Sequence, residues 1–133
     1  MLTLTYKIDG TAAQYAAIDA AIRTVQFVRN RCLRKWMDAD KQHPVSANDL
    51  QTYCANLAAE FPFAAALGSQ ARQVAADRAW CAISRFYANC HAHVPGKKGY
   101  PQFQHDCRSV EYKTAGWRLE DDGRHITFTD GTS

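Results

Sequence analysis

The sequence predicts an α+β fold in which a β-barrel-like module is interrupted by a three-helix insertion. Three observations predict it: residues 2–8 alternate apolar and polar side chains, residues 11–89 hold three segments of helical periodicity, and residues 102–129 hold short strand-like runs. Because a lone first strand needs a pairing partner, and the only candidates follow residue 100, the helices become an insertion. We therefore expect a wedge-like β module formed by residues 1–10 and 95–133, and a helical module over residues 11–94.

The helices are predicted from caps, breaks and apolar periodicity. Thr11 is a favourable N-cap for a long first helix, in which apolar side chains recur at steps of three and four residues. Pro44 breaks this helix, and residues 46–49 (Ser-Ala-Asn-Asp) form a start signal for a short second helix. Ser69 caps a third helix that runs to about Asn89, and its many alanines allow another helix to approach closely.

The pattern changes after residue 94, because residues 95–101 (Pro-Gly-Lys-Lys-Gly-Tyr-Pro) form a loop that cannot be helical. Short strands are predicted near residues 102–104, 108–114, 116–120 and 125–129. Residues 121–123 (Asp-Asp-Gly) have the chemistry of a hairpin turn between the last two strands. Because a sheet this small would keep unpaired edges, we expect the β module to be incomplete, the chain to be truncated, and more chain or a second protein to complete the sheet.

Length and composition limit the class of protein. At 133 residues, the chain has room for one medium domain or two small modules that share a core. Its 47% hydrophobic and 22% charged residues are ordinary for a globular protein. Five widely spread cysteines, and an N-terminus without a signal-peptide layout, indicate a reducing, cytoplasmic setting. No apolar run approaches the roughly 20 residues of a bilayer span, so we expect a soluble protein.

The formal charge of +3 hides two basic segments, residues 23–41 and 97–118, and an acidic C-terminal stretch. Such segments are able to follow a phosphate backbone, although the same charges are also typical of solvated helix faces. No pair of carboxylates is placed with a histidine or a nucleophile in a catalytic motif, so we expect no catalytic residue in this chain.

One combination of residues resembles a zinc site: Cys90 and His93 are followed by His105 and Cys107, and two cysteines with two histidines suit tetrahedral Zn²⁺. The spacing is not a standard one. We therefore expect neither a metal nor another cofactor in this chain.

Several motifs occur in the order that they have in the N-terminal part of OrfB/TnpB transposon proteins, whose relatives include the type V CRISPR effectors. They are residues 2–7 (Leu-Thr-Leu-Thr-Tyr-Lys), residues 27–33 (Phe-Val-Arg-Asn-Arg-Cys-Leu), Gln70 with residues 77–80 (Asp-Arg-Ala-Trp), residues 99–103 (Gly-Tyr-Pro-Gln-Phe) after two lysines, and residues 109–112 (Ser-Val-Glu-Tyr). Together they span nearly the whole chain, which therefore resembles this family. The chain departs from the family pattern at Arg29, Gln102 and Gln104, which indicates that phosphate contacts are redistributed.

The resemblance implies a wedge-like β-barrel interrupted by a helical recognition module, the arrangement already predicted from the residues. In this family the two modules contact guide RNA and target DNA, including the target-adjacent motif. DNA is cut by a RuvC-like fold further along the chain, where three carboxylates bind Mg²⁺, and neither these carboxylates nor the family's paired zinc cysteines occur here. We therefore expect the nucleic-acid-binding portion of a transposon-encoded RNA-guided DNA endonuclease, with guide RNA and target DNA as partners and Mg²⁺ needed only by the missing nuclease part.

The side chains expected to bind nucleic acid are basic, aromatic or amide groups. They are Lys97, Lys98 and Tyr100 in the loop, Gln70, Gln73, Arg72, Arg78 and Arg85 on the third helix, Arg31, Arg34 and Lys35 on the first helix, and Lys113 in the strands. Gln70 is the preferred reader of the target-adjacent motif, because glutamine can form two hydrogen bonds with adenine. A structural alternative stays open for each of them: Tyr100 and Phe103 could pin the loop to the barrel, and the helical residues could be solvated.

Two other functions stay open. The first is a small interaction protein derived from such a gene, whose open sheet edge binds a protein partner. The second is a DNA-binding repressor, although the first two helices are separated by more residues than the usual helix-turn-helix connection of three or four.

Overall fold

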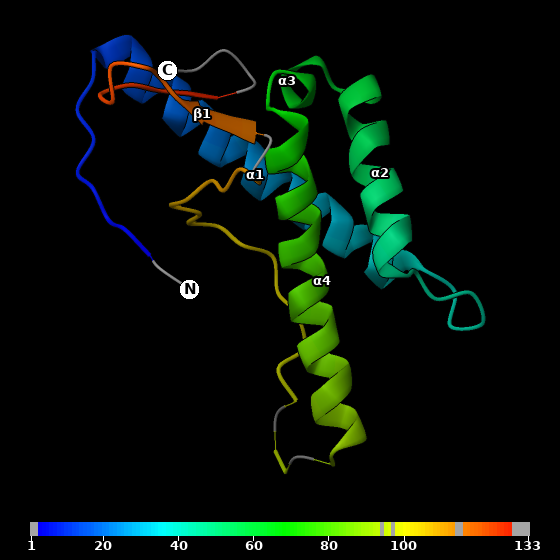
Figure 1. Ribbon diagram of the computed structural model, residues 1–133. Coiled ribbons are helices and arrows are strands. Elements are labelled where there is room, and N and C mark those ends of the chain that lie inside the picture. The colour runs from blue at the N-terminus through cyan, green and yellow to red at the C-terminus, as the bar shows by residue number, and fades with distance from the viewer. Residues whose placement is uncertain (1–2, 94, 97, 114–115, 129–133) are drawn as a thin grey trace.

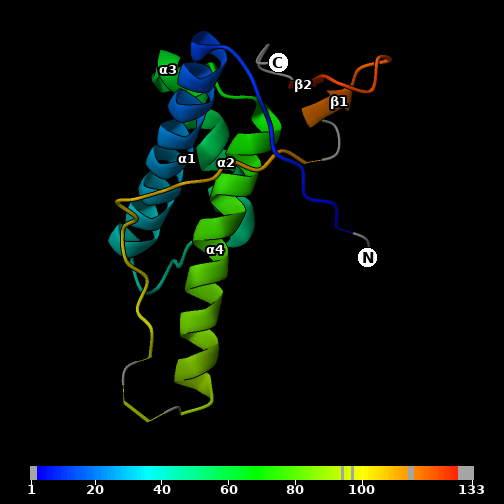
Figure 2. The same ribbon diagram turned by 90° about the vertical axis from the view of Figure 1, so that its left-hand side faces the viewer.

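The protein is mostly helical in a computed structural model that describes residues 3–93, 95–96, 98–113 and 116–128 (Figure 1). The elements within these residues are α1 (Ala12–Asp38), α2 (Ala47–Glu60), α3 (Pro62–Ala65), α4 (Ser69–His91), β1 (Trp117–Leu119) and β2 (Ile126–Phe128). The three long helices pack against one another. The β1–β2 hairpin lies at the same end of the molecule as α3 and the start of α1 (Figures 1 and 2).

The helix starts follow from their capping residues. The Thr11 side chain accepts a hydrogen bond from the backbone N–H of Gln14, and the Gln14 side chain accepts one from the backbone N–H of Thr11. Ser46 and Asp49 form the same reciprocal pair at the start of α2. Each capping box satisfies two backbone donors that a helix start leaves without a partner. α1 and α2 therefore begin where the sequence predicts. The prediction that Ser69 caps the third helix is wrong: α4 begins at Ser69, its N-cap is Gly68, and no side chain of the described residues caps it.

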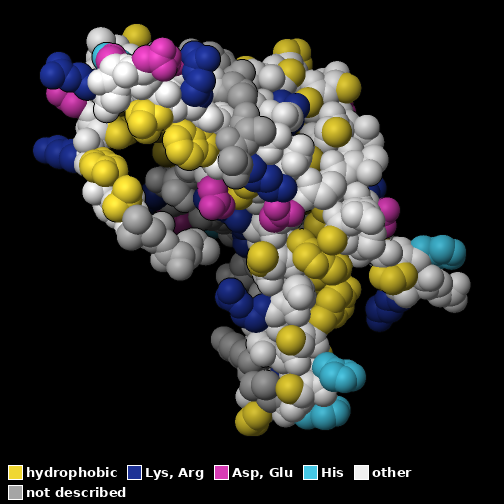
Figure 3. Space-filling view, viewed as in Figure 1, with side chains coloured by type: hydrophobic (Ala, Val, Ile, Leu, Met, Phe, Trp, Pro, Cys, Tyr) yellow, Lys and Arg dark blue, Asp and Glu magenta, His cyan; other side chains and the backbone are white. Residues whose placement is uncertain are grey.

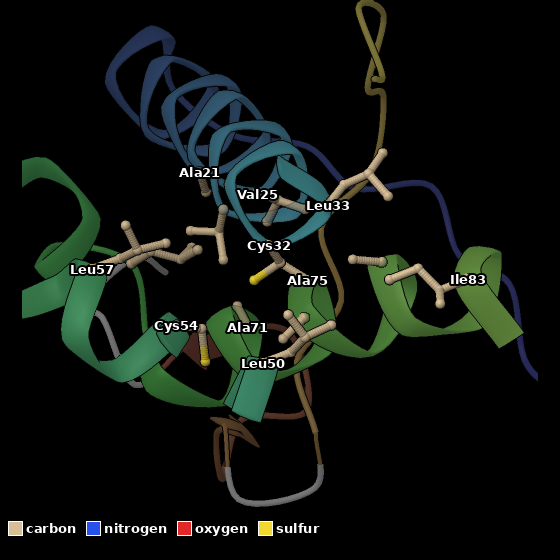
Figure 4. Packing of buried hydrophobic residues seen from close by; sticks show 14 residues of the cluster. Ala21, Val25, Cys32, Leu33, Leu50, Cys54, Leu57, Ala71, Ala75 and Ile83 are labelled. Carbon is tan, nitrogen blue, oxygen red and sulfur yellow. The ribbon is translucent and has the colours of Figure 1, made fainter. Parts of the chain in front are cut away.

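The hydrophobic core lies where α1 and α2 pack against α4 (Figure 4). It is formed by Ala21, Val25, Val28, Cys32 and Leu33 of α1, Leu50, Cys54 and Leu57 of α2, and Ala71, Ala75, Ala79 and Ile83 of α4, among others. Ala71, Ala75 and Ala79 are fully buried, and their small side chains let α1 approach α4 closely. This packing holds one face of α4 in the core and leaves the opposite face for other contacts.

An extended segment, residues 98–113, runs from the end of α4 back along α1 and α4 (Figure 2). We call it the docked segment. Helix side chains hold its backbone: Asn30 donates from Nδ2 to the carbonyl of Gln104 at 2.8 Å and accepts from the N–H of Gln104 at 2.8 Å. Gln26 accepts from the N–H of Cys107 at 2.9 Å, and Asn89 donates to the carbonyl of Lys98 at 3.0 Å. These bonds take the place of a β-ladder.

The predicted β-barrel-like module is wrong, since the described residues contain one two-stranded antiparallel sheet, in which Trp117, Arg118 and Leu119 pair with Phe128, Thr127 and Ile126. The predicted strands at 102–104 and over the described part of 108–114 are absent. Polar side chains of α1 and α4 bond the backbone there, and backbone groups satisfied in this way no longer need a neighbouring strand. The two strands that do form lie inside the predicted 116–120 and 125–129.

The predicted first strand is also wrong within the described residues. Residues 3–10 form no ladder, and Leu4, Tyr6 and Ile8 are 63%, 76% and 59% exposed. Alternation specifies a strand only where a sheet offers an edge to pair with, and the docked segment offers none. The hairpin turn is confirmed: Gly123 has a φ of 69°, and the N–H of Glu120 donates to the carbonyl of His125 at 2.8 Å.

All helices of the described residues lie between residues 12 and 91, and the division of the chain at residues 10 and 95 stays a prediction. None of these helices combines the length and the hydropathy that crossing a membrane requires.

Candidate nucleic-acid interface

A groove of about 510 Å³ lies between α4 and the end of the docked segment. We call it the arginine groove, because Arg29 of α1 and Arg78 and Arg85 of α4 line it. Its other lining residues are Val74, Asp77, Cys81, Ala82, Glu111, Tyr112 and Lys113. Four cationic and two acidic side chains leave the groove with a net positive charge, and basic and acidic groups lie close together over α4 in the middle of Figure 3.

Two of the three arginines are held in place by the docked segment. Arg78 donates from Nη1 to the carbonyl of Ser109 at 3.1 Å and from Nη2 to its Oγ at 3.3 Å. Arg29 donates from Nη1 to the carbonyl of Gln102 at 3.0 Å. Partial burial lowers the pKa of Arg29, but an arginine stays charged in a protein. Each guanidinium has five N–H donors, so both retain donors for a further ligand.

Arg85 differs from the other two arginines. It is exposed, and within the part of the chain that the structure describes it has no hydrogen-bond or ion-pair partner. A paired arginine uses some of its donors within the protein, whereas, among the described residues, all five donors of Arg85 are open to a ligand. It is therefore the arginine of the groove that can bind an anion without giving up a contact with the protein.

Lys113 and Asp77 form an ion pair at 3.3 Å that lines the arginine groove and also a second groove of about 510 Å³ between α2 and α4. Lys113 also donates to Oε1 of Gln73 at 3.4 Å, and Gln51 donates to Asp77 at 2.6 Å. The side chains of Lys113 and Asp77 are 41% and 50% exposed, so the pair is weak and open to exchange with another anion.

The structure brings Arg78, Arg85 and Lys113 together in the arginine groove, as a binding role requires. Arg72 and Gln73 instead line the second groove. Arg72 donates to the backbone carbonyls of Ala64, Ala65 and Leu67, which end α3 and the turn after it, so its guanidinium is committed to the fold.

The predicted cluster on α1 lies elsewhere, and each of its members has a partner within the protein. Arg31 stacks on the rings of Phe27 and Phe61, at 5.7 and 5.4 Å from the ring centroids. Lys35 lies over the ring of Tyr53 at 4.9 Å. Arg34 forms an ion pair with Asp38 at 3.0 Å. Cation–π contacts and an i,i+4 ion pair are ordinary ways in which a helix uses exposed charges.

The loop residues and Gln70 have separate positions. Lys97 lies outside the described residues. Lys98 is half-buried, and Tyr100 packs against Trp36 and Phe86. The Gln70 side chain packs against Gly116: a Cβ added to that glycine would lie 2.8 Å from Cβ of Gln70. Gln70 is thus half-buried by the chain before β1.

Sequence reasoning missed the α1 side chains that bind the backbone of the docked segment, Gln26, Arg29 and Asn30, of which Arg29 also lines the groove. They lie at steps of three and four residues on α1, which places them on one polar stripe beside the apolar stripe of the core. A polar stripe rich in amides next to a buried stripe is the signal that could have indicated a bound backbone segment. The four zinc candidates do not come together: within the described part of the chain, no three His, Cys, Asp or Glu side chains could hold a metal ion.

No protein-family model matches the sequence, and no curated protein matches it either.

Proposed function

We propose that this chain is the nucleic-acid-binding portion of a transposon-encoded RNA-guided DNA endonuclease, contacting guide RNA and target DNA, and that the arginine groove binds the phosphate backbone. The observation that carries the proposal is the groove itself, in which three arginines and a lysine line one concave surface. Arginine presents a fork of donors that matches phosphate oxygens, and backbone contacts dominate the affinity of proteins for nucleic acids.

The spacing of the cations supports the proposal. Arg78 and Arg85 are seven residues apart on α4, which at about 1.5 Å per residue places them roughly 10 Å apart along the helix axis. Phosphates of one stacked strand follow one another at about 3.4 Å along its axis, so the two arginines span about three nucleotides. Two charges at this interval are able to bind one strand without competing for the same phosphate.

The resemblance to OrfB/TnpB proteins supports the more specific part of the proposal, that the ligands are a guide RNA and a target DNA with its adjacent motif. RNA-guided proteins bind mainly by shape and backbone contacts and leave the sequence to base pairing. A groove lined by guanidinium groups suits a protein that binds the phosphate backbone and leaves the sequence to base pairing. The proposal gives the groove no catalytic role, since Asp77 is paired with Lys113 and Glu111 is a single exposed carboxylate.

A fluorescence-anisotropy titration of labelled RNA and DNA at increasing salt tests the proposal. Arg85→Ala should weaken binding and reduce the slope of log affinity against log salt by about one, because one phosphate contact is lost. Arg85→Lys should retain most of the slope. The matched control is Arg23→Ala, which removes an exposed arginine of α1 that lies outside the groove and has no partner among the residues that the structure describes.

No binding of any nucleic acid at low salt would refute the proposal, as would equal losses for Arg85→Ala and Arg23→Ala. The first result would favour a small interaction protein, for which one observation speaks. The hairpin presents Trp117, Leu119 and Ile126 on one face, and they are 46%, 54% and 38% exposed. Such an apolar face is typical of a surface that a protein partner covers.

A further inference from the structure

A group of four aromatic residues lies where the C-terminal parts of α1 and α4 meet the docked segment. We call Trp36, Phe86, Tyr87 and Tyr100 the aromatic cluster. The ring of Tyr100 contacts Phe86 edge to face, at 5.1 Å between centroids and 82°, and Trp36 at 5.5 Å and 42°. Trp36 donates from Nε1 to the hydroxyl of Tyr87 at 2.7 Å, so the indole donor is already satisfied.

Tyr100 is well held yet half exposed. On one side Gly99, with a φ of 74°, turns the chain, and Asn89 binds the carbonyl of Lys98. On the other side Pro101 is buried and Arg29 binds the carbonyl of Gln102. Tyr100 nevertheless keeps 52% of its surface exposed. Its contacts with Trp36 and Phe86 are tilted or edge-on, so neither ring is stacked parallel to Tyr100.

The aromatic cluster and the arginine groove are built from neighbouring residues of α4 and from the same docked segment. Arg85 lines the groove, and the next residue along α4, Phe86, contacts Tyr100. Arg29 lines the groove from the other side and binds Gln102, two residues beyond Tyr100. A strand bound by Arg29 and Arg85 therefore has the docked segment that carries Tyr100 beside it. An exposed aromatic ring beside backbone-binding cations is how proteins bind unpaired nucleic acid.

We infer that Tyr100 stacks on an unpaired base, so that the ligand of the arginine groove is a single-stranded stretch of nucleic acid. This inference rests on the proposed function and narrows it. In a duplex the bases are already stacked and paired, and their faces are not available to Tyr100. The cations favour any phosphate backbone, whereas the ring favours only strands with free bases.

The test compares single-stranded RNA, single-stranded DNA and duplex DNA of the same sequence, each about twelve nucleotides long, by anisotropy. The decisive variants are Tyr100→Phe, which keeps the ring, and Tyr100→Leu, which keeps apolar packing against Trp36 and Phe86 but has no aromatic face. Tyr100→Leu should weaken single-strand binding by about 5- to 150-fold and leave duplex binding within about twofold. Tyr100→Phe should bind as the wild type does. The RNA and DNA arms show which single strand is preferred.

The control pair is Tyr15→Phe and Tyr15→Leu, at an exposed tyrosine near the start of α1 whose hydroxyl bonds to Gly10 and Asp9. A second measurement needs no variant: ultraviolet irradiation of the wild-type protein bound to a strand carrying 5-iodouracil should crosslink the peptide that contains Tyr100. Single-strand affinity unchanged in Tyr100→Leu, equal losses for duplex and single strand, or a crosslink elsewhere would overturn the inference. If Arg85→Ala still weakens binding in those cases, the proposed function stands and only this inference fails.

Discussion

Asn30 is the side chain that should most directly control whether the docked segment stays on the helices. Its amide donates to the carbonyl of Gln104 and accepts from the N–H of the same residue, both at 2.8 Å and both partly buried. Asn30→Ala removes the two bonds together. The docked segment carries Tyr100 and the carbonyls that hold Arg29 and Arg78, so its loosening should also disturb the arginine groove.

The expected magnitude follows from the two bonds. A buried or partly buried hydrogen bond contributes a net ~1 kcal/mol, so their loss costs about 2 kcal/mol. Alanine has a better helix propensity than asparagine by roughly 0.6 kcal/mol, which offsets part of this cost in the global free energy of unfolding. The free energy of opening the docked segment has no such offset, because α1 stays helical when only this segment detaches. A change of about 2 kcal/mol in that opening is about 30-fold in its equilibrium constant.

Amide hydrogen exchange measured by NMR tests this prediction, because it reports local opening at single residues. The protection of the Gln104 amide should fall about 30-fold in Asn30→Ala. The matched control is Asn56→Ala, the same substitution at an exposed position of α2, which measures the propensity effect alone. If Gln104 exchanges at the same rate in both variants, Asn30 does not hold the docked segment and the reasoning is wrong.

Three further predictions concern the scaffold. Arg72→Ala should lower the free energy of unfolding by about 1.5–3 kcal/mol in a urea titration, because charged hydrogen bonds to the end of α3 are lost; an unchanged midpoint would contradict this. A thiol reagent at pH 8 should modify exposed Cys81 long before Cys32, whose pKa burial raises to about 12; equal labelling rates in the native protein would refute it. Hydrogen bonds from Ser46 lower the pKa of Asp49, so the stability that its carboxylate contributes is complete above the ordinary pKa and is lost as pH falls through the lowered value. Asp49→Asn should therefore destabilise the protein at pH 7, and thermal unfolding should show this difference shrinking below about pH 4.

The helices could be predicted from the sequence because their signals are local. A cap such as Thr11 or Ser46, an apolar stripe and a proline break act within one turn of chain, so no knowledge of the rest of the fold is needed. The short α3 was not predicted, since Pro62 at its first turn also fits a simple break between two helices. The hairpin turn was predicted for the same local reason, the glycine at position 123.

The strands failed because pairing is not local. Residues 102–104 have the pattern of a strand, but whether their backbone bonds another strand or a helix side chain depends on what faces them. Arg29 and Asn30 of α1 face them and supply the bonds. The alternation in residues 3–8 likewise indicates only that an extended chain would have one apolar and one polar face. Because no sheet edge pairs with this segment, its apolar side chains stay exposed.

The roles of the candidate site residues also depend on contacts that the sequence does not show. Arg31, Arg72 and Arg85 look alike in the sequence, as basic residues on helices with apolar neighbours. Their roles differ because of the groups that the fold places beside them. Arg31 stacks on the ring of Phe61, Arg72 binds the carbonyls of α3 and of the turn after it, and Arg85 meets neither a carbonyl nor a carboxylate in the described residues. Arg31 and Arg72 lie outside the groove and use these contacts to hold the fold, whereas Arg85 lines the groove and can bind a phosphate without giving up a contact. Arg85 should therefore contribute more to the salt-dependent affinity than Arg31 and Arg72 together. Substituting Arg31 or Arg72 should lower the free energy of unfolding and leave the slope of log affinity against log salt nearly unchanged.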